Sequence, residues 1–142
     1  MSDRLILMYG LLVLVGFADA AYLSAMHYYQ TDPGCSLITG CDAVLNSEYA
    51  VMFGVPLAYS GLLYYVTLLF GTVFYYQNGS DRIILGLITI NGIGLLFSLY
   101  LIYIQAFVLH AFCQYCLLSA LVTTTLFIVI VIGYLRNRNV ST

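Results

Sequence analysis

The sequence predicts an all-α integral membrane protein: a single domain over residues 1–142, with a four-helix bundle and an extracytoplasmic lid loop that contains a short helix. Three observations predict this class. Of the 142 residues, 63% are hydrophobic and 7% are charged. The mean hydropathy is +0.99, and long uncharged stretches separate the charges. Soluble domains average roughly half apolar and a quarter charged residues, so a water-soluble globule is excluded. A net charge of −2 without a basic run excludes a nucleic-acid partner.

The uncharged stretches define the membrane spans. A bilayer core about 30 Å thick takes about 20 helical residues. The 53 uncharged residues 83–135 therefore hold two spans, which turn back near Gln105, His110 and Gln114. We expect helices at about 5–29, 56–77, 83–109 and 112–135, with an outer loop at about 30–55.

Turn-forming residues mark three of these boundaries. Pro33 and Gly34 end the first helix, and Pro56 suits the first turn of the second helix. A turn formed by Asn78, Gly79 and Ser80 precedes the third helix. The turn between the third and fourth helices has no Gly or Pro to mark it.

The arginines predict the orientation. With four spans, Arg4, Arg82, Arg136 and Arg138 all fall on one side of the membrane, and no Lys or Arg remains for the other side. The positive-inside bias then predicts a multi-pass cell-membrane protein with both termini and the turn at 78–82 in the cytoplasm. The long loop and the turn near residue 110 become extracytoplasmic.

All four cysteines fall on that outer side. Cys35 and Cys41 lie in the long loop, while Cys113 and Cys116 begin the fourth helix. Only hydropathy and arginines entered this topology, so the convergence of the cysteines is independent of it. Extracytoplasmic thiols are expected to be oxidised or redox-active.

The two cysteine pairs differ in local chemistry. Cys113 and Cys116 form a C-x-x-C motif whose sulfurs share one helix face, and a helix N-terminus favours thiolate. Cys35 and Cys41 lie in a Gly-containing loop whose disulfide could move. Four cysteines allow three pairings; pairing within each couple is the default, and Cys41 with Cys113 is a possible intermediate.

The connection of about 26 residues between the first two helices is too long for a mere turn, and such loops are usually functional. Residues 42–47 are expected to form a short helix with Val44 and Leu45 facing the membrane. We interpret this loop as a lid over the mouth of the bundle.

Two alternatives to a redox relay remain open from spacing alone. Two static disulfides could brace the lid of a non-catalytic membrane protein. The thiolates, with or without His27 or His110, could form the metal site of a transporter. A C-x-x-C at the outer end of a membrane helix, opposite a second pair, favours the relay without a metal.

Several motifs together resemble one family. The string C-D-A-V-L-N-S-E-Y-A-V-M-F-G-V-P runs from Cys41 to Pro56, and Cys35 lies six positions before it. Gly61 and Tyr65 follow, and then Phe112 with the C-x-x-C. This order, across nearly the whole chain, resembles the vitamin K epoxide reductase family.

The resemblance implies an electron relay to a quinone such as ubiquinone or menaquinone. A reduced thioredoxin-like partner or a substrate thiol would attack at Cys35, Cys41 would pass electrons to Cys113, and Cys116 would face the quinone. The net reaction of such a thiol oxidase makes protein disulfides and quinol. Several bacterial members carry a fused thioredoxin domain; this sequence ends at Thr142, so we expect a separate extracytoplasmic partner.

Two positions depart from the vertebrate members. A Tyr four positions after the last cysteine and an Asn three positions before the Phe-Gly pair correspond here to Ala120 and Ala50. The resemblance therefore does not carry epoxide reduction to this chain.

Other polar and aromatic residues are weaker candidates. Asp19 lies near mid-span, where an ionisable group is costly and a functional role is suspected by default. His110 is near enough in sequence to support a Cys113 thiolate. We expect Asn91 and Gln105 to bridge helices. The expected quinone pocket comprises Phe112, Tyr115, Ser119 and Tyr59, with Ser47 in the loop as a further candidate.

Overall fold

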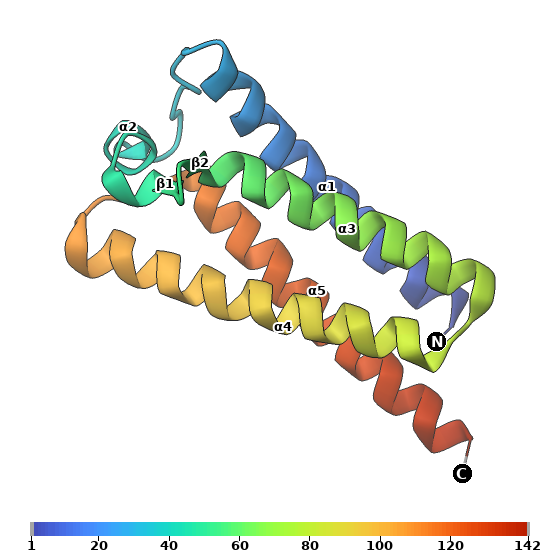
Figure 1. Ribbon diagram of the computed structural model, residues 1–142. Coiled ribbons are helices and arrows are strands. Elements are labelled where there is room, and N and C mark those ends of the chain that lie inside the picture. The colour runs from blue at the N-terminus through green and yellow to red at the C-terminus, as the bar shows by residue number, and fades with distance from the viewer. Residues whose placement is uncertain (1, 142) are drawn as a thin grey trace.

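The computed structural model describes residues 2–141, and over these residues the protein is all-α apart from two very short strands. Four long helices run side by side within this part of the chain (Figure 1). They are α1 (Asp3–Tyr28), α3 (Leu57–Asn78), α4 (Asp81–Tyr103) and α5 (Gln114–Val140), and a π-helix η2 (Ile104–Val108) continues α4. All four are long and apolar enough to cross a bilayer, which confirms the predicted class of multi-pass membrane protein.

The fourth predicted helix, residues 112–135, has the wrong ends. In the structure α5 begins at Gln114 and continues to Val140. The expected C-terminus marked the end of the apolar run, but helical hydrogen bonding continues through exposed polar residues that include Arg136 and Arg138. At the other end, Cys113 is the residue before the helix, with an extended backbone (φ −105°, ψ 121°).

The bundle is held by close packing of α1 on α3 and α5, and of α4 on α5 and α3. Gly16 of α1 lies directly against the ring of Tyr65, where a Cβ atom would overlap the ring. This contact lets the Tyr65 hydroxyl reach α5, where it lies 2.8 Å from Ser119 Oγ and 3.3 Å from Thr123 Oγ1. Helices α1, α3 and α5 are thus joined near the middle of the bundle.

Asn91 bridges three helices, as the sequence predicts. Its side-chain amide donates to the Tyr9 hydroxyl of α1 at 2.6 Å and to Leu87 O of its own helix at 2.8 Å. Its carbonyl oxygen accepts a hydrogen bond from the Tyr64 hydroxyl of α3 at 3.3 Å. Such interhelical bonds stabilise membrane bundles by about 0.6–2 kcal/mol each.

The long loop folds over one end of the bundle. It contains α2 (Cys41–Leu45), η1 (Glu48–Ala50) and an antiparallel pair of strands, β1 (Val51–Met52) and β2 (Val55–Pro56). These elements lie beside the start of α5, whereas both termini and the α3–α4 turn lie at the opposite end (Figure 1).

The expectation that Val44 faces the membrane is wrong. Val44 is 8% exposed and packs against Cys41 and Cys113, because α2 turns its apolar side toward the start of α5. Leu45 packs at the edge of the same cluster. Burial against protein, rather than lipid, therefore holds the short helix.

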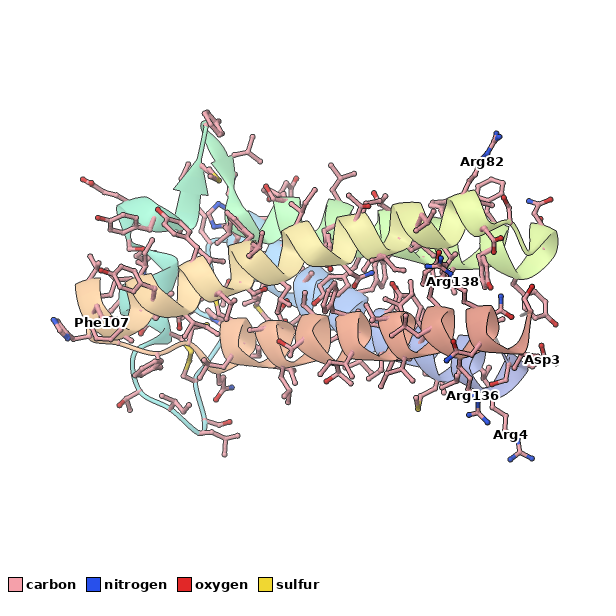
Figure 2. All side chains as sticks on the ribbon, turned by 90° about the horizontal axis from the view of Figure 1, so that it is seen from below. Asp3, Arg4, Arg82, Phe107, Arg136 and Arg138 are labelled. Carbon is pink, nitrogen blue, oxygen red and sulfur yellow. A yellow bond between two sulfur atoms is a disulfide. The ribbon has the colours of Figure 1, made fainter. Side chains whose placement is uncertain are left out.

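The arginines all lie at one end of the molecule. Figure 2 shows Arg4, Arg82, Arg136 and Arg138 at the end that carries Asp3, while Phe107 marks the opposite end. The bundle therefore separates its basic residues from the loop along its length.

Candidate redox site

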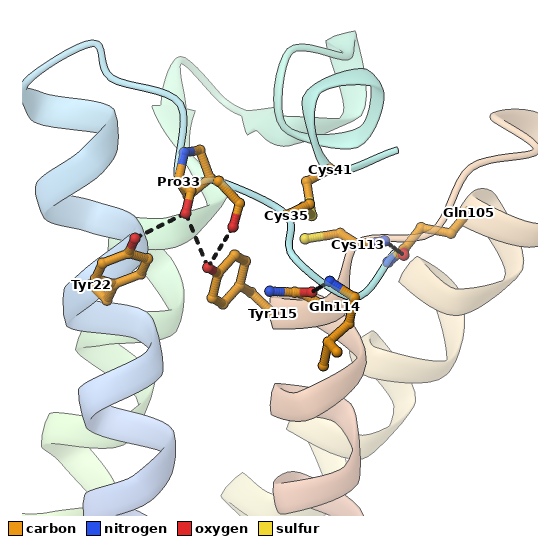
Figure 3. Close-up of a disulfide and its surroundings, with 10 residues drawn as sticks. Tyr22, Pro33, Cys35, Cys41, Gln105, Cys113, Gln114 and Tyr115 are labelled. Carbon is orange, nitrogen blue, oxygen red and sulfur yellow. Dashed lines mark hydrogen bonds between the residues drawn. A yellow bond between two sulfur atoms is a disulfide. The ribbon is translucent and has the colours of Figure 1, made fainter. Parts of the chain in front are cut away.

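The four cysteines lie together under the loop. Cys35 and Cys41 form a disulfide with a Cα–Cα distance of 6.1 Å, and Cys113 and Cys116 are free thiols. Cys41 and Cys113 are buried in one small apolar cluster, against which Cys35 and Cys116 pack. The Cys113 side chain points toward the disulfide (Figure 3).

The backbone around Gly40 brings the disulfide to α5. Gly40 precedes α2 with φ +135°, a conformation that L side chains rarely adopt. A Cβ atom at this position would lie 3.2 Å from Phe112 O and 3.3 Å from Ala111 Cβ. Glycine thus permits the close approach that buries Cys41 against Cys113.

Hydrogen bonds fasten the loop near Cys35 to α1 and α5. The Tyr115 hydroxyl donates to Pro33 O at 3.0 Å and Gly34 O at 3.1 Å, and the Tyr22 hydroxyl donates to Pro33 O at 2.9 Å (Figure 3). The Leu37 N–H donates to Gln114 Oε1 at 3.0 Å. Three of these four bonds lie at exposed positions.

Gln105 holds the backbone of Cys113. Its side chain is 3% exposed, and its Oε1 accepts a hydrogen bond from the Cys113 N–H at 3.0 Å (Figure 3). The residue lies in the π-helix η2, a type of segment that is frequent at functional sites. Gln105 was predicted to bridge helices. In the structure it joins η2 to Cys113, the residue that precedes α5.

The sulfur of Cys113 is poised to ionise. Its pKa is lowered to about 7, chiefly because the Cys116 thiol donates a hydrogen bond to it. Burial acts in the opposite direction, backbone N–H groups of Tyr115 and Cys116 lower the pKa further, and the charge of Asp19 raises it. Cys113 therefore becomes the nucleophilic thiolate near neutral pH.

A cavity of about 700 Å³ opens between the four long helices at the loop end. Its walls are largely apolar, and its size is in the range of small-molecule sites. Its lining includes six residues with polar or thiol side chains from α1, α3 and α5: Asp19, Tyr65, Tyr115, Cys116, Ser119 and Thr123. Cys116 borders the cavity, whereas Cys113 is not among its lining residues.

The structure brings only part of the predicted pocket together. Tyr115, Ser119 and Ser47 line the cavity, but Phe112 and Tyr59 do not. Phe112 is 39% exposed, in the segment before α5, and Tyr59 packs edge-on against His27 with ring centroids 5.8 Å apart. Both were expected because they lie near the outer mouth, but sequence position alone does not place a side chain at the cavity wall.

His110 is not among the groups that shift the pKa of Cys113. It is exposed and adopts a left-handed backbone conformation with φ +50°, at the end of the turn that follows η2. Only Ala111 and Phe112 separate it from Cys113 in sequence, but His110 is exposed whereas Cys113 is buried. Cys116 supplies the stabilising donor instead.

Tyr65 and Thr123 belong to the cavity but are not candidates from sequence. Tyr65 does appear in the string that resembles the family, which is the one signal that could have singled it out. Its hydroxyl is within hydrogen-bond distance of Ser119 and Thr123. Their shared hydrogen bonds depend on contacts between α3 and α5, which local sequence does not encode.

The arrangement can carry out thiol–disulfide exchange between two couples. A partly buried disulfide, a nucleophilic thiolate and a second thiol beside a cavity follow one another across the site. Within residues 2–141, no three His, Cys, Asp or Glu side chains gather closely enough to hold a metal ion. Fold and site together define a membrane-embedded dithiol–disulfide centre.

Comparison with known proteins gives the family. Residues 7–131 match the model of the Vitamin K epoxide reductase family, so the chain belongs to that family. It is also 35% identical over 120 residues to "Thiol-disulfide oxidoreductase LTO1" of Arabidopsis thaliana. That match covers 77% of this chain and 31% of the plant protein, so the chain spans about a third of its relative.

Proposed function

We propose that the protein is a membrane thiol oxidase that passes electrons from dithiols through its two cysteine couples to a quinone, and so supports disulfide-bond formation. The order of the sulfurs carries this proposal. Cys113 packs against Cys41 on one side, and its neighbour Cys116 lines the cavity on the other. A structural pair of disulfides would not need a thiol at the wall of a cavity.

Electrons pass from the partner to the Cys35–Cys41 couple and then to the Cys113–Cys116 couple, each time by thiol–disulfide exchange. A partner thiolate attacks Cys35, which releases Cys41 as a thiolate, and the partner's second thiol then releases the partner as a disulfide. Cys41 next attacks Cys113 of an oxidised Cys113–Cys116 couple, and Cys35 resolves this mixed disulfide. The product has a Cys35–Cys41 disulfide and two free thiols, the pairing present in the structure.

The cavity fits a quinone. Its largely apolar walls suit a ring with a lipid tail, and Tyr115 and Ser119 line it together with Cys116. When bound, a quinone accepts two electrons and two protons, which returns Cys113 and Cys116 to a disulfide. Ala50 and Ala120 also line the cavity and bring no polar side-chain atom, which supports thiol oxidation over epoxide reduction.

We further propose that the loop end faces the extracytoplasmic side, where a separate thioredoxin-like protein delivers the electrons. Support comes from the four arginines at the other end of the bundle, which the positive-inside bias assigns to the cytoplasm. The exposed part of the loop next to Cys35 would receive the partner.

Quinone reduction by the purified protein tests this function. We expect activity with a dithiol donor in the wild type and loss of at least 100-fold in Cys113→Ala and Cys116→Ala, since each removes a sulfur that the final step requires. Cys35→Ala should lose activity with a protein donor and keep it with a small thiol. Circular dichroism checks that each variant is folded.

Two results would contradict the proposal. Retained activity in Cys116→Ala would show that the cavity-lining thiol is not needed. Absence of quinone reduction in the folded wild type, with the Cys35–Cys41 disulfide resistant to a dithiol donor, would instead favour a structural role for the cysteines.

A further inference from the structure

Asp19 is a buried acid whose chemistry remains unused by the cysteine exchanges. It lies near the middle of α1, is 9% exposed, and lines the same cavity as Cys116. Its Oδ2 has no hydrogen-bond partner among residues 2–141. Buried polar atoms are almost always paired, so an unpaired carboxyl oxygen at a cavity wall indicates a missing ligand.

The neighbouring polar groups do not satisfy this carboxyl. The Tyr65 hydroxyl is engaged with Ser119 and Thr123, at 2.8 Å and 3.3 Å from their side-chain oxygens. All three line the cavity with Asp19, yet their hydrogen bonds are made to one another. The free oxygen of Asp19 is therefore available to a molecule in the cavity.

Asp19 is also an electrostatic neighbour of the thiols. Its negative charge acts on the Cys113 sulfur, which places the carboxyl within interaction range of the couple. Cys116 and Asp19 border one cavity from α5 and α1, so a molecule bound between these two residues would lie next to both. Ionisable side chains inside a membrane bundle are expensive and commonly belong to proton pathways.

We propose that Asp19 is a catalytic carboxyl that carries a proton between the Cys116 thiol and an oxygen of the bound quinone. The inference rests on the proposed function and adds to it the group that moves the proton. Oδ2 of Asp19 accepts the proton of Cys116 Sγ and delivers it to the quinone oxygen. This role would explain why a carboxyl is retained at mid-span without a partner in the protein.

The step balances in electrons and protons. The S–S bond between Cys113 and Cys116 forms, the two sulfurs lose two electrons, and the quinone is reduced to quinol by those two electrons. One proton comes from Cys116 through Asp19, which ends the step in the state in which it began. The second comes from Cys113, or from water at the open loop end when that sulfur is already a thiolate.

Asp19→Asn tests the inference, because it keeps the shape of the side chain and cannot carry a proton. We expect kcat for quinone reduction to fall by about 100-fold or more, the loss typical of a removed general acid–base group, with KM for the quinone nearly unchanged. Asp19→Glu should recover part of the rate. Reduction of the Cys35–Cys41 disulfide by a dithiol without quinone should proceed as in the wild type.

Infrared difference spectroscopy provides a readout besides activity. Addition of a short-chain quinone to the reduced protein should perturb a carboxylate stretching band that is absent from Asp19→Asn and shifted in Asp19→Glu. Thr72→Val is the matched control, because Thr72 is buried and its hydroxyl donates to Leu68 O of its own helix at 2.7 Å. That variant should keep both the band and the rate.

The outcomes separate this inference from the proposed function. A folded wild type that does not reduce quinone overturns both. If the wild type reduces quinone, and Asp19→Asn retains its kcat or the band stays unperturbed by quinone, the inference alone is overturned. Should Asp19→Asn fail to fold, the band in the wild type and its shift in Asp19→Glu decide the question.

Discussion

Cys113 and Cys116 are three residues apart, yet their neighbours give them different chemical roles. Cys113 precedes the first turn of α5, where backbone N–H groups and the Cys116 thiol all act on its sulfur. Cys116 lies inside the helix and borders the cavity. In the proposed function, Cys113 exchanges with the loop disulfide and Cys116 faces the quinone.

This difference predicts that the pKa of the Cys113 thiol depends on Cys116. The Cys113 thiol should ionise with a midpoint near pH 7, so it is a thiolate above that pH and a neutral thiol below it. In Cys116→Ala the midpoint should rise, because the thiol that donates to the Cys113 sulfur is lost. NMR of reduced protein labelled with ¹³C at cysteine Cβ measures both midpoints.

Cys35→Ala is the control for that titration, since its sulfur is not among the groups that shift the pKa of Cys113. A midpoint that is the same in Cys116→Ala and in the wild type would refute the assigned donor.

At the scale of elements, the junction between η2 and α5 positions the nucleophile. The π-helix directs Gln105 inward, and its side chain accepts the hydrogen bond of the Cys113 N–H. Gly40 brings α2 against the same short segment from the loop side. Three elements far apart in sequence thus converge on one residue.

Gln105→Met should destabilise this junction. The buried Cys113 N–H would lose its acceptor, which costs about 1–3 kcal/mol in the free energy of unfolding. Reversible unfolding in detergent measures the loss. The exposed Gln77 at the far end of α3 provides the control Gln77→Met, for which we expect a change below about 0.5 kcal/mol. Equal stability of the two variants would contradict the assigned role of Gln105.

At the scale of the whole molecule, the arginines and the four cysteines lie at opposite ends of the bundle. The arginines cluster at the end that carries both termini, and the loop, the four sulfurs and the open end of the cavity lie at the other. A disulfide at that end could meet a soluble partner while Cys116 serves a ligand from the bilayer.

Labelling with a membrane-impermeant maleimide tests the proposed orientation. In a background without native cysteines, Leu37→Cys, at a position 86% exposed in the loop, should label in intact cells. Ser141→Cys, exposed beyond α5, should label after permeabilisation only. The reverse pattern would mean that the loop faces the cytoplasm.

Hydropathy and charge by themselves determined the membrane class, the four spans and the gathering of the cysteines at the loop end, because these follow from properties that vary along the chain. The same properties misplaced the ends of α5, where the helix continues past the apolar run into polar residues. Local composition therefore gives the existence of an element more securely than its limits.

Only the tertiary structure decided which side chains meet. Packing of α1 against α5 puts Asp19 and Cys116 on one cavity, and contact between α3 and α5 joins Tyr65 to Ser119. Phe112 and His110 are near Cys113 in sequence, yet both are exposed and neither lines the cavity. The physical reason is that the direction of a side chain depends on helix rotation and packing between distant segments, which no local pattern encodes.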